Sequence, residues 1–209
     1  MNRNNWHAFR IVAAMCVASL PVGISSADWR ATSVLTGAAG LTIALSFVPK
    51  VWSVPSGRDQ SRTSVLAEIA LSWLIVTATS TVLTVILARL TLPDSILADP
   101  MSALFEATSG LTTTGLTMLS NPSDASSVLQ WWRTVSQWIG GIGVVVFGLA
   151  AAERSGDDNG ALEESWGQMP SSDHAGMAAR RIISIYIGLT AVMFVGLWVA
   201  GTSLWVSLN

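Results

Sequence analysis

Long uncharged apolar runs, separated by short polar segments, make up most of the chain. A helix needs about 20 mostly apolar residues to cross a bilayer. Five runs meet or approach that length, at residues 11–27, 31–49, 69–88, 134–152 and 182–209. The pattern therefore predicts an all-α membrane protein with about five transmembrane helices.

A sixth uncharged run, at residues 107–123, has a different composition because it is rich in Thr, Ser and Gly. Residues 101–109, which overlap the start of this run, have helical character, and we expect that helix to stop at Gly110. The following stretch, LTTTGLT, is too short for a strand in a sheet and too polar to face lipid. We therefore predict a re-entrant pore helix and filter loop, as in the helix–pore–helix repeat of potassium channels, within residues 64–152.

These elements divide the chain into four parts. Run 11–27 has the flanking Arg residues and small C-terminal residues of a cleaved signal peptide, which remains an alternative. The short link at residues 28–30 favours a helical hairpin instead. We expect an N-terminal two-helix hairpin with a cytoplasmic turn, a helix–pore-loop–helix repeat, a cytoplasmic connector and the first helix of a second repeat, at residues 1–63, 64–152, 153–181 and 182–209.

Composition agrees with a membrane location and argues against catalysis. The chain is 51% hydrophobic and 11% charged, whereas soluble domains carry about 25% charged residues. A net charge of −2 gives no basic surface for nucleic acid. The single Cys16 is expected to be a small buried hydrophobe, and His7 and His174 lie too far apart in sequence to suggest a metal site. With no phosphate loop or catalytic triad in the sequence, we expect neither an enzyme nor a cofactor.

Positive charges and tryptophans predict how the chain sits in the membrane. Cytoplasmic loops carry an excess of Lys and Arg. With the N-terminus inside, eight such residues are cytoplasmic and three are outside, with Arg30, Arg89 and Arg133 making up the outer set. Six tryptophans fall near predicted span ends and are expected to anchor the chain at the interface, namely Trp6, Trp29, Trp52, Trp131, Trp132 and Trp205.

The loop LTTTGLT has the chemistry of an ion filter. An alkali cation that leaves water needs replacement oxygens, which backbone carbonyls and Thr hydroxyls supply. Gly115 suits a loop whose carbonyls must turn inward, because glycine adopts conformations closed to other residues. The preceding half-helix would direct its partly negative C-terminal end at the cation. From these residues alone, an ordinary Thr-rich external loop stays open as the alternative.

Two motifs extend this interpretation. FEATSGLTTTGLT (residues 105–117) and WRTVSQWIGGIG (residues 132–143) resemble the SGLTTTG loop and the YRQxxQWxGGxG helix of the Trk/Ktr/HKT superfamily of potassium transporters, in its TrkH-like branch. EESWGQMP and AARRIISIYIGL, further along, resemble that family's connector and the next helix. The resemblance covers essentially the whole chain and implies potassium uptake across the bacterial cytoplasmic (inner) membrane, as a multi-pass protein with a cytoplasmic N-terminus.

The resemblance also assigns roles to individual residues. It implies a selectivity filter of Thr112, Thr113, Thr114, Gly115 and Leu116, with K⁺ bound by the carbonyls of Thr113, Thr114 and Gly115. Three residues of the pore helix would support this filter, namely Glu106, Ser109 and Gly110, although Glu106 could equally be a carboxylate of the outer vestibule or a cap. Arg133 could pair with an outer acidic residue or be a plain interfacial arginine. Close helix packing is expected at Gly140, Gly141 and Gly143.

The family's filter needs four repeats, and one complete repeat is present in these 209 residues. We therefore expect a TrkH-like translocating subunit, or a fragment of one, whose pore is completed by further repeats from another chain or from the missing remainder. Assembly from identical copies is less favoured. A non-conducting truncated remnant or membrane scaffold is the alternative. Family members also work with a cytosolic nucleotide-binding regulatory subunit, which would contact the cytoplasmic loops.

Overall fold

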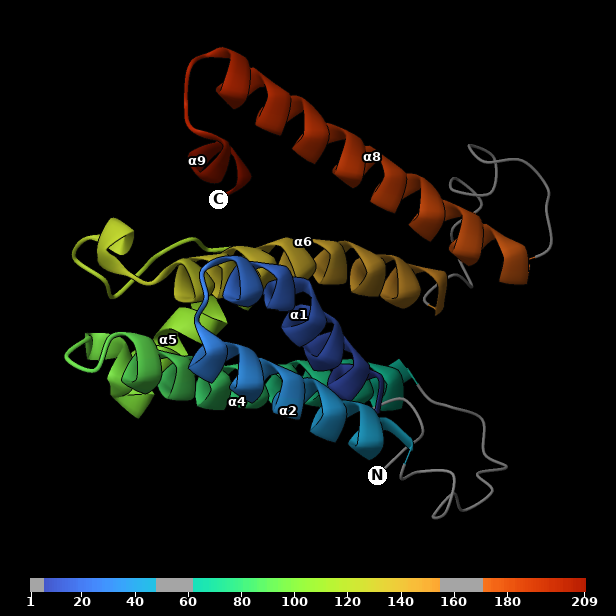
Figure 1. Ribbon diagram of the computed structural model, residues 1–209. Helices are drawn as coiled ribbons and strands as arrows, with labels where there is room; N and C mark the ends of the chain where they lie inside the picture. Colours follow the sequence, from blue (N-terminus) through green and yellow to red (C-terminus); the bar gives the residue numbers. More distant parts are fainter. Residues whose placement is uncertain (1–5, 48–61, 155–170) are drawn as a thin grey trace. The chain divides into compact units, whose positions relative to one another are not determined.

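The computed structural model describes residues 6–47, 62–154 and 171–209, and all regular structure in these parts is helical (Figure 1). The prediction of an all-α chain is therefore confirmed for the described residues. They form two compact units, Met1–Gly141 and Ile142–Asn209. Most of the predicted cytoplasmic turn at the end of 1–63 and most of the predicted connector at 153–181 lie outside the described residues.

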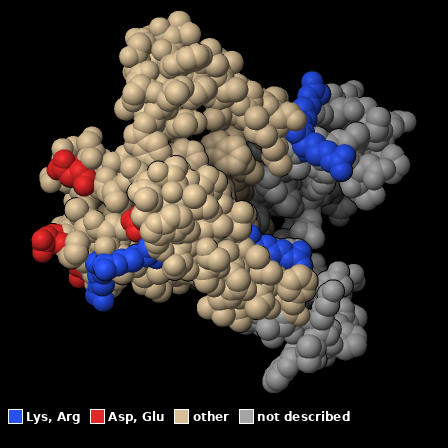
Figure 2. Space-filling view, viewed as in Figure 1, with Lys and Arg blue, Asp and Glu red and all other residues tan. Residues whose placement is uncertain are grey.

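Three helices in the described parts are long and apolar enough to cross a membrane, namely α1 (Trp6–Ser25), α4 (Arg62–Thr91) and α8 (Ser171–Val199). The other two predicted spans also form helices, α2 (Trp29–Phe47) and α6 (Ser127–Arg154). Figure 2 shows broad surface areas without any charged side chain, as expected for a membrane protein.

In the first unit, α1 and α2 pack against each other and both contact α4. Asp28 explains why α2 begins where it does. Its Oδ1 accepts a hydrogen bond from the backbone N–H of Ala31 at 3.0 Å, as a helix N-cap residue does. The short link thus joins two helices that pack against each other.

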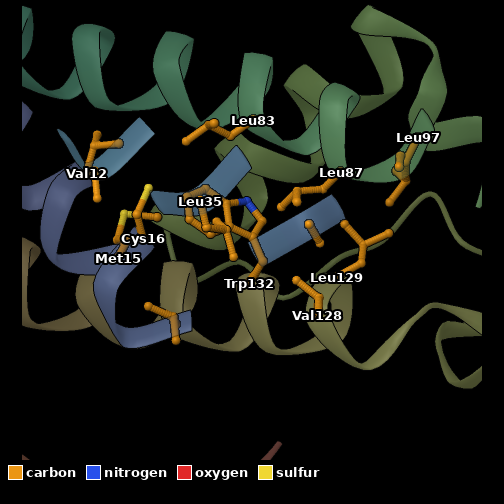
Figure 3. Close-up of a cluster of buried hydrophobic side chains, with 14 of the residues drawn as sticks. Val12, Met15, Cys16, Leu35, Leu83, Leu87, Leu97, Val128, Leu129 and Trp132 are labelled. Carbon is orange, nitrogen blue, oxygen red and sulfur yellow. The ribbon is translucent and has the colours of Figure 1, made fainter. Parts of the chain in front are cut away.

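The core of the first unit is assembled from distant parts of the sequence (Figure 3). Side chains from α1, α2, α4 and α6 meet there, including those of Met15, Cys16, Leu35, Leu87 and Trp132. Cys16 is fully buried in this cluster, as predicted. Trp132 is 1% exposed, so its assignment to the interfacial belt was wrong. Its indole Nε1–H donates to Thr84 Oγ1 at 3.1 Å, which holds α6 against α4.

A short connection leads from α4 to α5 (Pro100–Leu111) through the 3-10 helix η1 (Ile96–Ala98). Asp99 is the N-cap of α5, where its Oδ2 accepts the Ser102 N–H at 2.9 Å. Pro100 occupies the first helical position, where its missing N–H costs nothing. The hydrogen bond from the Ser102 backbone lowers the pKa of Asp99, so this cap stays ionised at neutral pH.

The second unit contains the end of α6, the helix α8 and the short helix α9 (Leu204–Leu208). Two boundaries here differ from the prediction of one segment at 182–209. Helix α8 begins at Ser171, inside the predicted connector, and ends at Val199. The chain then turns at Gly201, whose φ of 96° is a left-handed conformation that favours glycine.

Candidate functional site

A loop follows α5 and precedes α6, with the 3-10 helix η2 (Pro122–Asp124) near its end. The short helix α5 was predicted to stop at Gly110, which proved wrong because it continues to Leu111 with Thr112 as its C-cap. The helix ends there because the Ser109 carbonyl accepts the N–H of Thr114 at 2.9 Å, which turns the chain away from the helix axis. The stretch LTTTGLT is therefore an irregular loop that starts at the C-terminal end of α5.

In the first part of this loop the backbone N–H groups are hydrogen-bonded and several backbone carbonyl groups are not. Four consecutive N–H groups, those of Thr112, Thr113, Thr114 and Gly115, donate to carbonyls of α5 at distances from 2.9 to 3.5 Å. In contrast, the carbonyl oxygens of Thr113, Thr114 and Gly115 accept no hydrogen bond from any described residue. All five residues from Thr112 to Leu116 are exposed in the described chain. The loop thus presents free oxygens at Thr113, Thr114 and Gly115, while the N–H groups from Thr112 to Gly115 are all bonded.

Two positions in the loop have a positive φ. Gly115 has a φ of 76° and Thr113 has a φ of 58°. A left-handed conformation is ordinary for glycine but a genuine outlier for a β-branched residue such as threonine. The surrounding hydrogen bonds must therefore hold Thr113 in this conformation.

Side chains of α5 secure the loop from behind. The Ser109 hydroxyl donates to the Leu116 carbonyl at 2.7 Å. The Thr112 hydroxyl donates to the Thr108 carbonyl at 2.8 Å and lies 2.8 Å from the Thr114 hydroxyl. The hydroxyls of Thr112 and Thr114 therefore serve the loop itself, and Leu116 has already used its carbonyl within the chain.

Glu106 connects three segments of the first unit. Its side chain is only 4% exposed, and it forms an ion pair through Oε1 with Nε of Arg133 on α6. Its Oε2 accepts hydrogen bonds from the Thr117 hydroxyl and the Met118 N–H, each at 3.0 Å. A buried carboxylate requires such partners. The arrangement fixes the chain directly after the loop to both α5 and α6.

Helix α6 approaches the end of α5 very closely at a glycine. A Cβ atom added to Gly140 would lie 2.3 Å from the Leu111 carbonyl oxygen. Ser136 lies one turn before Gly140 on α6. A Cβ added to Gly110 of α5 would lie 3.4 Å from the Ser136 Cβ. Gly141 is next to Gly140 in the same helix, whereas Gly143 belongs to the second unit.

Part of the predicted set lines one pocket beside the loop, whereas Thr112, Thr113 and Thr114 do not line it. Its lining includes Glu106, Ser109, Gly110, Gly115 and Leu116 from the predicted set. Sequence reasoning did not assign its other lining residues, which are Thr84, Ala107, Trp132, Ser136 and Gln137, and left the partner of Arg133 undefined. A helical spacing of three and four residues from Arg133 to Ser136 and Gln137 is the signal that could have placed them on one face.

The fold is therefore that of a helical membrane protein in which a short helix and an irregular loop with free carbonyl oxygens lie between two long helices. The family of TrkH cation transport proteins matches residues 38–207. That match covers most of the chain, so the chain belongs to the TrkH family. No solved structure matches it.

Curated relatives support this assignment over part of their length. The chain is 34% identical over 105 residues to the Trk system potassium uptake protein TrkI of Halomonas elongata, covering 49% of this chain and 21% of the relative. It is 32% identical over 104 residues to the Trk system potassium uptake protein TrkH of Escherichia coli, covering 47% and 22% respectively. An uncharacterized cation transporter of Methanocaldococcus jannaschii is 34% identical over 113 residues, covering 52% and 23%. The chain thus spans about a fifth of the length of these relatives.

Proposed function

We propose that this chain takes part in potassium uptake as a TrkH-like translocating subunit, with residues 112–116 forming one strand of the selectivity filter. The observation that supports this most directly is the polarity of the loop, whose carbonyls at Thr113, Thr114 and Gly115 are free while the N–H groups from Thr112 to Gly115 are bonded to α5. Anion sites present free N–H groups, so this loop is suited to a cation. Neutral backbone oxygens are the ligands that replace the hydration shell of K⁺.

Conformational strain gives independent support. A β-branched residue in a left-handed conformation, as at Thr113, is found where function requires it. Thr113 and Gly115 flank Thr114, which does not have a positive φ. Changes of handedness along a backbone turn successive peptide groups of one kind toward one side, which in anion sites are the N–H groups, whereas in this loop the free groups are the carbonyls. We propose that this is how the three carbonyls face one ion path.

One strand cannot surround an ion. The TTTG motif occurs once in the sequence, and a filter rings its ion with oxygens from several loops. We propose that the remaining strands come from another chain or from further repeats of a longer protein, in the bacterial inner membrane with the N-terminus in the cytoplasm. A cytosolic nucleotide-binding subunit is a proposed regulatory partner.

A second function is a non-conducting membrane scaffold, which the single TTTG motif would also allow. Growth of a bacterium deficient in potassium uptake separates the two functions. The gene is introduced alone and together with neighbouring reading frames, and growth is measured at limiting K⁺. We expect at least one combination that needs this gene to restore growth. Failure of every combination, with the chain present in the membrane, would favour the scaffold.

Replacing Gly115 by serine in a conducting assembly is expected to weaken selection of K⁺ over Na⁺. A Cβ at this position would lie 3.5 Å from Gln137 Nε2, which is ordinary contact, so crowding is not the cause. The φ of 76° is the cause, since left-handed backbone costs a residue with a Cβ roughly 1–2 kcal/mol. Competition between K⁺ and Na⁺ in tracer uptake measures the effect. An unchanged ratio would remove Gly115 from the filter.

A further inference from the structure

One face of α6 follows the loop and the end of α5. Arg133, Ser136, Gln137 and Gly140 recur at intervals of three, four and seven residues, which places them on one side of a helix. Arg133 is occupied by its ion pair, and Ser136 and Gly140 lie against α5. Gln137 is the member of this face whose side chain reaches the loop.

The contact of Gln137 is with Gly115. Gln137 Nε2 lies 3.5 Å from the position that a Cβ on Gly115 would occupy, and no other atom of the described residues comes within 4 Å of that position, chain neighbours aside. Both residues line the same pocket. The Gln137 amide has no hydrogen-bond partner among the described residues and is exposed. A neutral donor group therefore stands directly beside the glycine.

The chemistry of an amide suits this place. Its NH₂ group can donate to backbone carbonyls, and those of Thr113, Thr114 and Gly115 have no other donor among the described residues. Because the amide is uncharged, it can support the loop without repelling a cation. Arg133, one turn earlier on the same face, could not do this, since its charge is committed to Glu106.

We infer that Gln137 is a positioning residue for Gly115 and thereby sets the discrimination between K⁺ and Na⁺. The inference rests on the proposed function of the loop as a filter strand. A ring of oxygens distinguishes two alkali cations by its size and by the number of oxygens it presents. Both require that the carbonyls are held in place by a supporting group. Gln137 would supply that support from α6 by donating to a free carbonyl in the assembled filter, whereas Ser109 of α5 already donates to the Leu116 carbonyl.

The test is Gln137→Leu, which keeps the approximate size of the side chain and removes its hydrogen-bonding groups. In the conducting assembly we expect K⁺ uptake to persist while the preference for K⁺ over Na⁺ falls about fivefold, the effect of losing the one hydrogen bond that the amide would donate to a carbonyl of the assembled filter. The matched control is Gln130→Leu on the same helix, whose amide donates to the Ser123 and Ala125 carbonyls instead. That variant should keep the parental preference.

The amount of each variant in the membrane is measured in parallel. If Gln137→Leu does not accumulate, Gln137→Ala removes the same amide, with the same expected loss of preference. A parental preference in a Gln137 variant that transports K⁺ overturns this inference and leaves the proposed function intact. Equal losses in the Gln130 and Gln137 variants also overturn it, because the effect would then be general to α6. Absence of K⁺ transport by the parent assembly overturns the proposed function and this inference together.

Discussion

Replacing Gly140 by alanine is expected to prevent α6 from packing on the end of α5. The added Cβ would lie 2.3 Å from the Leu111 carbonyl oxygen and 2.8 Å from its carbonyl carbon. Both are backbone atoms, so no side chain can move aside and the two helices must separate. Overpacking of this kind costs about 1–3 kcal/mol or more. Since Leu111 immediately precedes the loop, we expect loss of transport as well as of stability.

The matched control for this variant is Gly40→Ala on α2. A Cβ there meets nothing within 4 Å, and alanine inside a helix is favoured over glycine by about 1 kcal/mol. Thermal unfolding in detergent and the amount of protein in the membrane are the measurements. We expect Gly40→Ala to match or exceed the parent and Gly140→Ala to fall well below it. Equal stability of the two variants would show that the close contact at Leu111 does not exist.

Replacing Glu106 by glutamine is expected to release the segment that follows the loop. The change removes the charge that pairs with Arg133 and weakens the bonds accepted from Thr117 and Met118. Removal of one partner from a buried pair costs 3–5 kcal/mol in general. Arg133 is 23% exposed at its side chain, so water can compensate it in part, and we expect about 2–3 kcal/mol. Potassium uptake should fall accordingly.

A double-mutant cycle isolates the pair. Glu106→Gln, Arg133→Gln and the double variant are compared with Asp124→Asn, which makes the same carboxylate-to-amide change at an exposed position. We expect the double variant to lose less stability than the sum of the two single variants. Strict additivity of the two losses, or an equal loss in Asp124→Asn, would contradict the assigned role of Glu106.

The sequence predicted that the long helices exist but did not place all their ends, since α8 begins at Ser171, inside the predicted connector. Asp99 and Pro100 define the beginning of α5 through a cap and a fixed φ. The end of α5 was placed one residue early because glycine is tolerated in the last turn, and the chain turns where Ser109 accepts the Thr114 N–H instead. Such a hydrogen bond depends on the three-dimensional path of the loop, so no sequence pattern predicts it.

The contacts of the candidate site were harder to predict. Glu106 and Arg133 are 27 residues apart, and sequence patterns do not give distances across that interval. Trp131 and Trp132 are adjacent and of the same residue type, so the sequence does not distinguish them. Consecutive side chains on a helix, however, point about 100° apart. Trp132 consequently enters the core against Thr84, while Trp131 bonds to the Ala18 carbonyl. Gln137 was missed for the same reason, since its role depends on which face of α6 meets the loop.

The central claim is that this chain contributes free backbone oxygens to a potassium path. Its most direct measurement is tracer rubidium uptake into potassium-depleted cells that carry this gene and its neighbouring reading frames, compared with cells that lack this gene alone. The account predicts saturable uptake that depends on the gene, competes with K⁺ and competes only weakly with Na⁺. Equal uptake with and without the gene, while the chain is present in the membrane, would contradict it.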